Sequence, residues 1–275
     1  MELTEEQIRE AQTELKRFLP RSLHVYGFLL LRNSVTPESV AVFVDRWPDF
    51  RVLVCRPQAE EKGDFFKDVL VFANDETILK EIIKRPNVIN WNKQVCFGLN
   101  HQHMEIFKAV ASEHKVPGCE HAVCHVMILE DVSKLPAIDS SGISLSSLDE
   151  SHISLLNETW KFGQCAEALR MIRNNLSNFP SCCVLDAEGK PVAWMLMYNS
   201  SALGMLYTLP EHRGKGYAKV LICTMAQRLH AEGYPVYCFV EEENALSYRI
   251  FTKLGFTEDP SYRAAWFRVN EDGTP

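Results

Sequence analysis

The sequence has no long apolar run and no concentrated basic segment. Its longest apolar stretches, such as residues 192–198, are far shorter than the about 20 residues that span a bilayer. The net charge is −7, and a nucleic-acid or anionic-membrane surface would need a concentrated basic face. We therefore expect no membrane span and no nucleic-acid partner.

The sequence also predicts neither a targeting segment at its start nor a framework of disulfides. The first residues, Met-Glu-Leu-Thr-Glu-Glu, are acidic and lack an apolar core, so neither a signal peptide nor an Arg-rich transit peptide is expected there. The nine cysteines are an odd number, and most lie in apolar runs. Buried free thiols in a reducing compartment explain them better than disulfides do.

The chain of 275 residues is long enough for a well-buried core and for two domains. Thr4 is predicted to cap a helix, with Gln7 at the capping-box position. The residues 134–141 are the best candidate linker. In the first half we expect strands at 23–31, 51–55, 68–73, 95–99 and 121–129, and helices at 4–19, 37–45, 76–83 and 103–114.

A second α/β set follows the candidate linker, so the fold class is α/β with a mixed sheet. Gly255 is a plausible C′ residue for its last helix. We expect strands at 143–148, 182–185, 192–198, 204–209, 235–240 and 262–269, and helices at 150–159, 165–176, 216–232 and 244–253.

The most informative segment is 207–218, Tyr-Thr-Leu-Pro-Glu-His-Arg-Gly-Lys-Gly-Tyr-Ala. A strand is predicted to end before Pro210, and a helix to begin near Gly216. Glycine tolerates positive φ and lets a ligand touch the backbone. A helix start offers free N–H groups and a positive dipole end to an anion. With the charges of Arg213 and Lys215 beside it, this turn is predicted to hold a pyrophosphate.

Other interpretations of the turn fit less well. A nucleotide P-loop needs Lys and Ser or Thr after its second glycine, where this chain has Tyr217. A Rossmann fingerprint needs a third glycine where Lys219 stands, although Glu241 lies where a ribose-binding acid belongs. A glycine-rich turn without a ligand also stays open.

Arg-x-x-Gly-x-Ala at 213–218, between a strand and a helix, resembles the GNAT superfamily of acyltransferases. Downstream, Asn244 and Tyr248 are four residues apart and so share one helix face. The resemblance implies that backbone amides of the turn wrap the CoA pyrophosphate, that Asn244 contacts the pantetheine arm, and that the Tyr248 hydroxyl protonates the leaving thiolate. It implies a CoA-binding set at Thr208, Leu209, Arg213, Gly214, Lys215, Gly216, Tyr217, Ala218 and Asn244.

A narrower resemblance covers nearly the whole chain. Segments at 47–50 (Trp-Pro-Asp-Phe), 89–91 (Ile-Asn-Trp), 160–163 (Trp-Lys-Phe-Gly), 179–183, 188–194 and 207–210 look like the glycine N-acyltransferase family. That family moves an acyl group from acyl-CoA to the amino group of glycine or another small amino acid. The resemblance implies an N-terminal GNAT-like domain at 1–135 and a C-terminal CoA-binding GNAT domain at 142–272.

One departure concerns the base. An ungapped count from Thr208 puts the family's proposed glutamate base at Ala202, and no carboxylate lies between 199 and 209. Glu241, Glu242 and Glu243 are the nearest substitutes, and we take Glu241 as the candidate; a solvated loop is the alternative for all three. Glu211 and His212 lie in the turn itself. Deprotonated amine captured from solution, or a catalytically weak paralogue, would also explain the alanine.

The remaining chemistry-bearing residues give weaker patterns. Cys119, His121, Cys124 and His125 fit no standard zinc spacing, and strand alternation sends Cys124 and His125 to opposite faces. Core packing is the better interpretation, so no metal site is expected. A thiol-nucleophile enzyme lacks a recognisable segment. Trp160 and Phe162 either line the substrate pocket or pack in the core.

We therefore expect an acyl-CoA:amino-acid N-acyltransferase with acyl-CoA as co-substrate and no tightly bound cofactor. A CoA-binding protein with weak chemistry is the rival, and a nicotinamide-dependent enzyme is the third option. A monomer is expected. The family resemblance implies a mitochondrial location, with the cytoplasm as the alternative.

Overall fold

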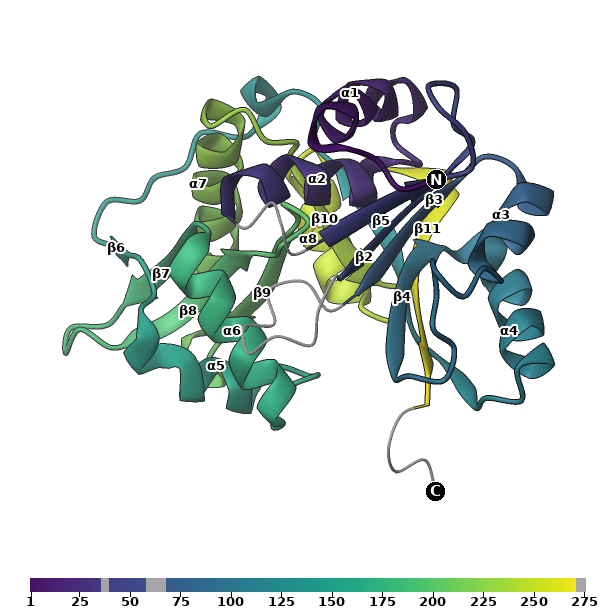
Figure 1. Ribbon diagram of the computed structural model, residues 1–275. Helices are drawn as coiled ribbons and strands as arrows, with labels where there is room; N and C mark the ends of the chain where they lie inside the picture. Colours follow the sequence, from purple (N-terminus) through teal and green to yellow (C-terminus); the bar gives the residue numbers. More distant parts are fainter. Residues whose placement is uncertain (36–39, 58–67, 271–275) are drawn as a thin grey trace.

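The computed structural model describes residues 1–35, 40–57 and 68–270. In these residues one sheet of eleven strands crosses the molecule, in the order β1-β2-β3-β4-β11-β5-β10-β9-β8-β7-β6 (Figure 1). The strands are β1 (Val40–Val44), β2 (Val52–Pro57), β3 (Val69–Ala73), β4 (Val95–Asn100), β5 (Gly118–Ile128), β6 (Ser144–Ser146), β7 (Ser181–Leu185), β8 (Pro191–Met197), β9 (Leu203–Thr208), β10 (Tyr237–Glu241) and β11 (Thr257–Val269).

Helices cover both faces of the sheet, and the buried side chains between helices and sheet form four clusters. In the first half, α1 and α2 pack on one face of β1–β3, and α3 and α4 on the other. In the second half, α7 and α8 pack opposite α5 and α6 (Figure 1). The helices are α1 (Glu5–Leu15), α2 (Leu23–Val35), α3 (Glu76–Ile83), α4 (Met104–Glu113), α5 (Ile153–Thr159), α6 (Ala166–Asn178), α7 (Tyr217–Ala231) and α8 (Ala245–Lys253).

The two halves repeat one arrangement of elements. The order β3-α3-β4-α4-β5 in the first half recurs as β9-α7-β10-α8-β11 in the second. In each copy the first two strands are parallel, whereas the other neighbouring strands are antiparallel. The α/β fold class with two similar halves is therefore confirmed.

The last strands of the two halves change places. β5, from the first half, pairs with β10 of the second, and β11, the final strand of the chain, lies between β4 and β5. The sheet is thus continuous across both halves, and residues of β5 and β11 meet the end of β10.

Two predicted elements are wrong. Residues 23–31 were expected to form a strand but belong to α2, where Val25, Phe28 and Leu29 are all buried. A helix enclosed on all sides is apolar all round, so it has no periodicity that separates it from a buried strand.

The second error concerns residues 37–45, expected to be helical. The structure has the strand β1 over Val40–Val44, and residues 36–39 lie outside the described residues. All five residues of β1 are buried, and β-branched and aromatic side chains such as Val42 and Phe43 favour a strand packed on both faces.

Most other expectations are confirmed. α3 has the predicted bounds, Thr4 and Gln7 form the capping box, and Gly255 has a φ of 91° after α8. All nine cysteines are free. Among the described helices, none combines the length and the apolar character that crossing a bilayer requires.

Candidate active site

A gap opens between the neighbouring strands β9 and β10. They pair at one position, Leu203 with Cys238. Past it, a bulge distorts β9: the register with β8 shifts between Trp194 and Leu196, and Met205 has a φ of 48°. A bulge adds one residue to one strand and bends it. β9 therefore leaves β10, and Glu241, three residues beyond Cys238 at the end of β10, lies beside the gap.

Backbone groups of β9 face this gap. The Leu209 N–H donates to the Val192 carbonyl of β8 at 2.9 Å, so Leu209 does not supply a free N–H to a thioester oxygen. Alternate residues of an antiparallel strand direct their backbone groups to opposite neighbours. The Thr208 N–H therefore points toward the gap, as does the Thr208 carbonyl, which accepts from Arg213 Nε at 3.1 Å.

The N-terminus of α7 lies open beside the gap. Gly214 and Gly216 have φ values of 78° and 79°, and a Cβ built on either meets no protein atom within 4 Å. No side chain caps the helix at Gly216. Within the described part of the chain, no hydrogen bond uses the N–H groups of residues 214–218. A positive-φ glycine turn with unpaired N–H groups at a helix start is typical of anion sites.

The equivalent helix start in the first half is closed. The Asp75 side chain caps α3 by accepting from the Ile78 N–H at 3.1 Å, and Glu76 adds a second negative charge. The cap, together with the Arg51 guanidinium, lowers the pKa of Asp75, so this end stays anionic. A phosphate is repelled there, and the two helix starts have opposite character.

The two cationic side chains of the turn, Arg213 and Lys215, form no ion pair with a carboxylate among the described residues. Arg213 folds over the Tyr207 ring at 5.6 Å from its centroid. Lys215 Nζ lies 3.4 Å from His212 Nδ1. Both charges stand beside the free amides, where an anionic ligand would meet them.

The start of α8 differs in one detail from the prediction. Asn244 is the N-cap rather than a helical residue, and its Oδ1 accepts from the Ser247 N–H at 3.1 Å. Its Nδ2 amide remains as a donor. Tyr248 follows one turn later, since its N–H donates to the Asn244 carbonyl at 3.1 Å.

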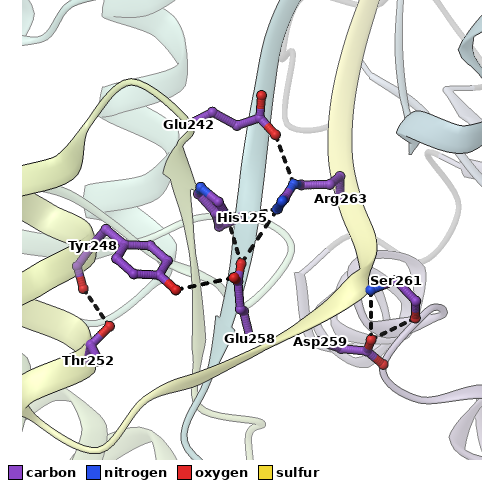
Figure 2. A network of polar contacts seen from close by, with 8 residues as sticks. All are labelled: His125, Glu242, Tyr248, Thr252, Glu258, Asp259, Ser261 and Arg263. Atoms are coloured by element: carbon purple, nitrogen blue, oxygen red, sulfur yellow. Dashed lines mark hydrogen bonds and ion pairs between the residues drawn. The ribbon is translucent and has the colours of Figure 1, made fainter.

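Tyr248 belongs to a polar network that joins β5, β11, α8 and the turn after β10 (Figure 2). Its hydroxyl donates to Glu258 Oε1 at 3.1 Å, and its ring lies 4.9 Å from the His125 ring. Glu258 Oε2 lies 2.6 Å from His125 Nδ1 and 3.5 Å from Arg263 Nη1. The hydrogen bond to Glu258, burial and the Glu258 charge raise the pKa of Tyr248.

His125 links the two charged groups of the network. Arg263 Nη1 lies 2.7 Å from His125 Nδ1, the same atom that faces Glu258. A guanidinium only donates and a carboxylate only accepts, so Nδ1 serves one partner at a time and its proton decides which. Glu258 and Arg263 were not predicted to be site residues, and His125 was expected only to pack in the core. The only sequence feature that could have indicated a role for His125 is the alternation of side chains along its strand, which turns it to the face opposite Cys124.

Glu241 is held by Lys161, which lies in the family-like segment 160–163 but was not expected to be a site residue. Its Oε2 accepts a hydrogen bond from Lys161 Nζ, and the two groups form an ion pair. This contact with Glu241 raises the pKa of Lys161. Glu242 instead pairs with Arg263 Nε at 2.8 Å. Neither glutamate is thus a freely solvated loop residue. Ala202, where the base was expected, is fully buried among apolar side chains.

The thiol and metal interpretations gain no support. Cys124 is buried, and burial together with the nearby Glu241 charge raises its pKa to about 12, so its nucleophilic thiolate is scarce at neutral pH. No cluster of three metal-ligating side chains occurs among the described residues. Phe162 contacts His121 at 4.9 Å between ring centroids, and Trp160 contacts Phe162 at 5.5 Å.

A hollow of about 470 Å³ lies elsewhere, at the opposite end of α7 from its open N-terminus. Its lining includes Phe179, Arg228 and Tyr234. Residues 228 and 234 flank the C-terminal end of α7, where carbonyl groups and a negative dipole end do not favour an anion. The hollow therefore does not coincide with the predicted site.

Comparisons with known proteins decide the family. Residues 3–180 match the model of the aralkyl acyl-CoA:amino acid N-acyltransferase family, and residues 182–269 match the model of its C-terminal region. This chain belongs to that family. A curated member, glycine N-acyltransferase of Bos taurus, is 31% identical over 277 residues, which cover 93% of this chain and 94% of the relative. The nicotinamide-dependent alternative is not supported by this membership in the aralkyl acyl-CoA:amino acid N-acyltransferase family.

Solved structures agree on the fold of this N-acyltransferase family member. An X-ray structure of a Drosophila protein has a TM-score of 0.81 at 16% identity and covers 99% of both chains. A tandem GNAT protein of the clavulanic acid biosynthesis pathway has a TM-score of 0.54 at 13% identity, covering 100% of this chain and 98% of the other. The tandem GNAT architecture matches the repeated halves.

Proposed function

We propose that this chain transfers an acyl group from acyl-CoA to the amino group of glycine or another small amino acid. The products are an N-acyl amino acid and free CoA. The observation that carries the proposal is the open glycine turn at the start of α7, beside the gap between β9 and β10. Membership in the aralkyl acyl-CoA:amino acid N-acyltransferase family supports it.

The turn is suited to bind the CoA diphosphate. Its free N–H groups at 214–218, which include those of Tyr217 and Ala218, would donate to the phosphate oxygens, and Arg213 and Lys215 would supply positive charge. Thr208 and Leu209 line the approach to the gap. The Asn244 Nδ2 at the start of α8 would donate to the pantetheine arm, as the family pattern implies.

Two groups on this chain would act on the thioester. The Thr208 N–H faces the gap and can donate to the thioester oxygen, where charge develops during attack. Tyr248 can protonate the sulfur as the carbon–sulfur bond breaks, and water then returns a proton to its phenolate. A phenol of ordinary pKa about 10 is protonated at neutral pH, and Glu258 raises the pKa of Tyr248 further, so the hydroxyl carries the proton that this step needs.

The base is the step that departs from the family pattern. An α-ammonium must lose a proton before its nitrogen attacks the thioester carbon. Ala202 cannot accept that proton, whereas the Glu241 carboxylate borders the gap. In this proposal Glu241 accepts it, the neutral amine forms the C–N bond, and the second nitrogen proton passes to water as the amide forms.

A catalytically weak CoA-binding paralogue is the second candidate. The observations that favour it are the apolar surroundings of Ala202 and the ion pair that occupies Glu241. Release of free thiol together with N-acyl amino acid, from several acyl-CoAs and common amino acids, separates the two candidates. Tight CoA binding without product would support the weak paralogue.

A matched set of glycine variants tests the CoA site. Gly214→Ala and Gly216→Ala place a methyl group where the diphosphate must approach, so CoA affinity should fall at least about tenfold, or 1.4 kcal/mol. Gly233→Ala is the control. Gly233 has the same positive φ and open surroundings but lies about 25 Å away along α7, so it shares the conformational cost and should keep CoA affinity. Equal affinity in all three variants, by calorimetric titration, would refute the site.

We also propose that the protein acts as a monomer in mitochondria, as the family resemblance implies. Light scattering on the purified chain and organelle fractionation test these two points. The domain limits 1–135 and 142–272 likewise stay a prediction.

A further inference from the structure

The ion pair between Lys161 and Glu241 lies on one side of the gap, opposite Tyr248. Side chains alternate along β10: Tyr237 and Phe239 pack in the cluster that contains Ala202, while Cys238 and Val240 pack against α7 and α8. Glu241 continues the first series, and Tyr248 packs on the second cluster. The pair therefore faces the gap from the side where the missing base would have been.

This ion pair is not needed to hold its loop. Residues 160–164 are fixed by other bonds: the Gly163 N–H donates to the Trp160 carbonyl at 2.9 Å, and the Gln164 N–H donates to Asn157 Oδ1 at 2.9 Å. The Lys161 side chain is 62% exposed and that of Glu241 26%. Exposed pairs of this kind contribute little to stability. Both side chains therefore reach solvent, on a backbone that is held independently of the ion pair.

We propose that Lys161 and Glu241 together bind the acceptor amino acid as a zwitterion. The Lys161 ammonium pairs with the α-carboxylate, and the Glu241 carboxylate pairs with the α-ammonium. This inference rests on the proposed function and names the acceptor site: one cation and one anion match the two charges of a free α-amino acid. An amine without a carboxylate would leave Lys161 on Glu241 and bind poorly.

The arrangement also frees the base when the acceptor arrives. Without acceptor, Lys161 occupies Glu241 Oε2. An incoming α-carboxylate competes for Lys161, and the α-ammonium takes its place at Glu241. One proton can then move from the ammonium nitrogen to Glu241, which leaves a neutral amine beside the gap. The substrate's own carboxylate is thus the feature that activates the base.

The test compares glycine with glycinamide, which lacks the carboxylate charge. Binding of each is measured by titration into the CoA-saturated chain, alongside kcat/KM. The wild type should favour glycine by at least about tenfold. Lys161→Gln should lose that preference with unchanged CoA affinity, and Lys161→Arg should keep most of it. Lys108→Gln, which removes another exposed lysine–glutamate pair on α4, should behave as wild type.

The outcomes separate this inference from the proposed function. A Lys161→Gln chain that keeps the wild-type preference, or a wild-type chain that binds glycine and glycinamide equally, overturns the zwitterion site. Lys161-dependent glycine binding without any N-acyl product supports the zwitterion site and refutes the proposed transfer. Product formation that Lys161→Gln does not affect supports the proposed transfer and refutes the zwitterion site.

Discussion

At the scale of single residues, the site depends on which charge each group faces. Tyr248 faces Glu258, and Glu241 faces Lys161. A carboxylate that accepts from a phenol hydroxyl resists its ionisation, because the phenolate would add a second negative charge. Glu241, the same type of side chain, is instead paired with the Lys161 ammonium. In the proposed function, Glu258 would therefore support the acid, Tyr248, and Glu241 would be the base.

The Glu258→Gln variant tests the acid. The amide oxygen of the new side chain can still accept a hydrogen bond from the Tyr248 hydroxyl but carries no charge, so the pKa of Tyr248 falls toward its ordinary value of about 10. If Tyr248 is the acid, as proposed, the protonated tyrosine is the active form, and activity is lost as pH rises through its pKa. Because the wild-type pKa is raised, the alkaline limb of kcat should move to lower pH in the variant.

Asp259→Asn is the matched control for this pH profile. Asp259 is the next residue, but it accepts from the Ser261 N–H and hydroxyl and does not contact Tyr248 (Figure 2). Its variant should keep the wild-type limb. An unshifted alkaline limb in Glu258→Gln would show that Glu258 does not set the protonation of Tyr248.

At the scale of elements, α2 explains how the two halves fit together. It packs in the core of the first half, and its Leu31 reaches the cluster beneath α7. Gly27 permits this approach, since a Cβ built there would lie 2.1 Å from the Ser200 carbonyl oxygen and 2.9 Å from the Tyr237 hydroxyl. The helix therefore supports the turn that precedes β9 and contains Ala202.

The Gly27→Ala variant is expected to destabilise the protein, although replacing glycine by alanine in a helix usually stabilises it. In an open helix, alanine for glycine stabilises by about 1 kcal/mol. Here the methyl group meets a backbone oxygen that cannot move alone, and overpacking of this kind costs about 1–3 kcal/mol. We expect a net loss in the free energy of unfolding by denaturant titration. A gain in stability would mean that α2 does not contact the 200–202 turn so closely.

At the scale of the whole molecule, the exchange of last strands makes the halves interdependent. β11 pairs on both edges, with β4 and with β5, and its Ala264, Ala265 and Phe267 are buried. Glu258 and Arg263 of the same strand complete the network around Tyr248. The final strand thus closes the sheet and supplies the site.

A chain that ends at residue 256 should therefore not fold. Without β11, the edges of β4 and β5 would be left unpaired in the middle of the sheet, and the apolar side chains that pack against β11 would lose cover. A chain that ends at residue 270 keeps every strand and is the control. A cooperative thermal transition in the shorter chain would contradict the dependence of one half on the other.

Prediction from the sequence succeeded where the interactions are local. The bounds of α3, the Thr4 cap and the positive φ of Gly255 follow from residues within one helical turn of each other. It failed for α2 and β1, because both are buried all round and carry no alternation to separate helix from strand. Within the site, it found the turn but not the partners of Tyr248 and Glu241.

The turn at 210–218 was determined by the sequence alone. A proline that ends a strand and two glycines before a helix act on their own backbone, so the free amides and their charges follow without the rest of the chain. Only the tertiary structure brought Lys161 to Glu241 and Arg263 to His125, across 80 and 138 residues. Such contacts depend on strand order and register, which no local preference specifies.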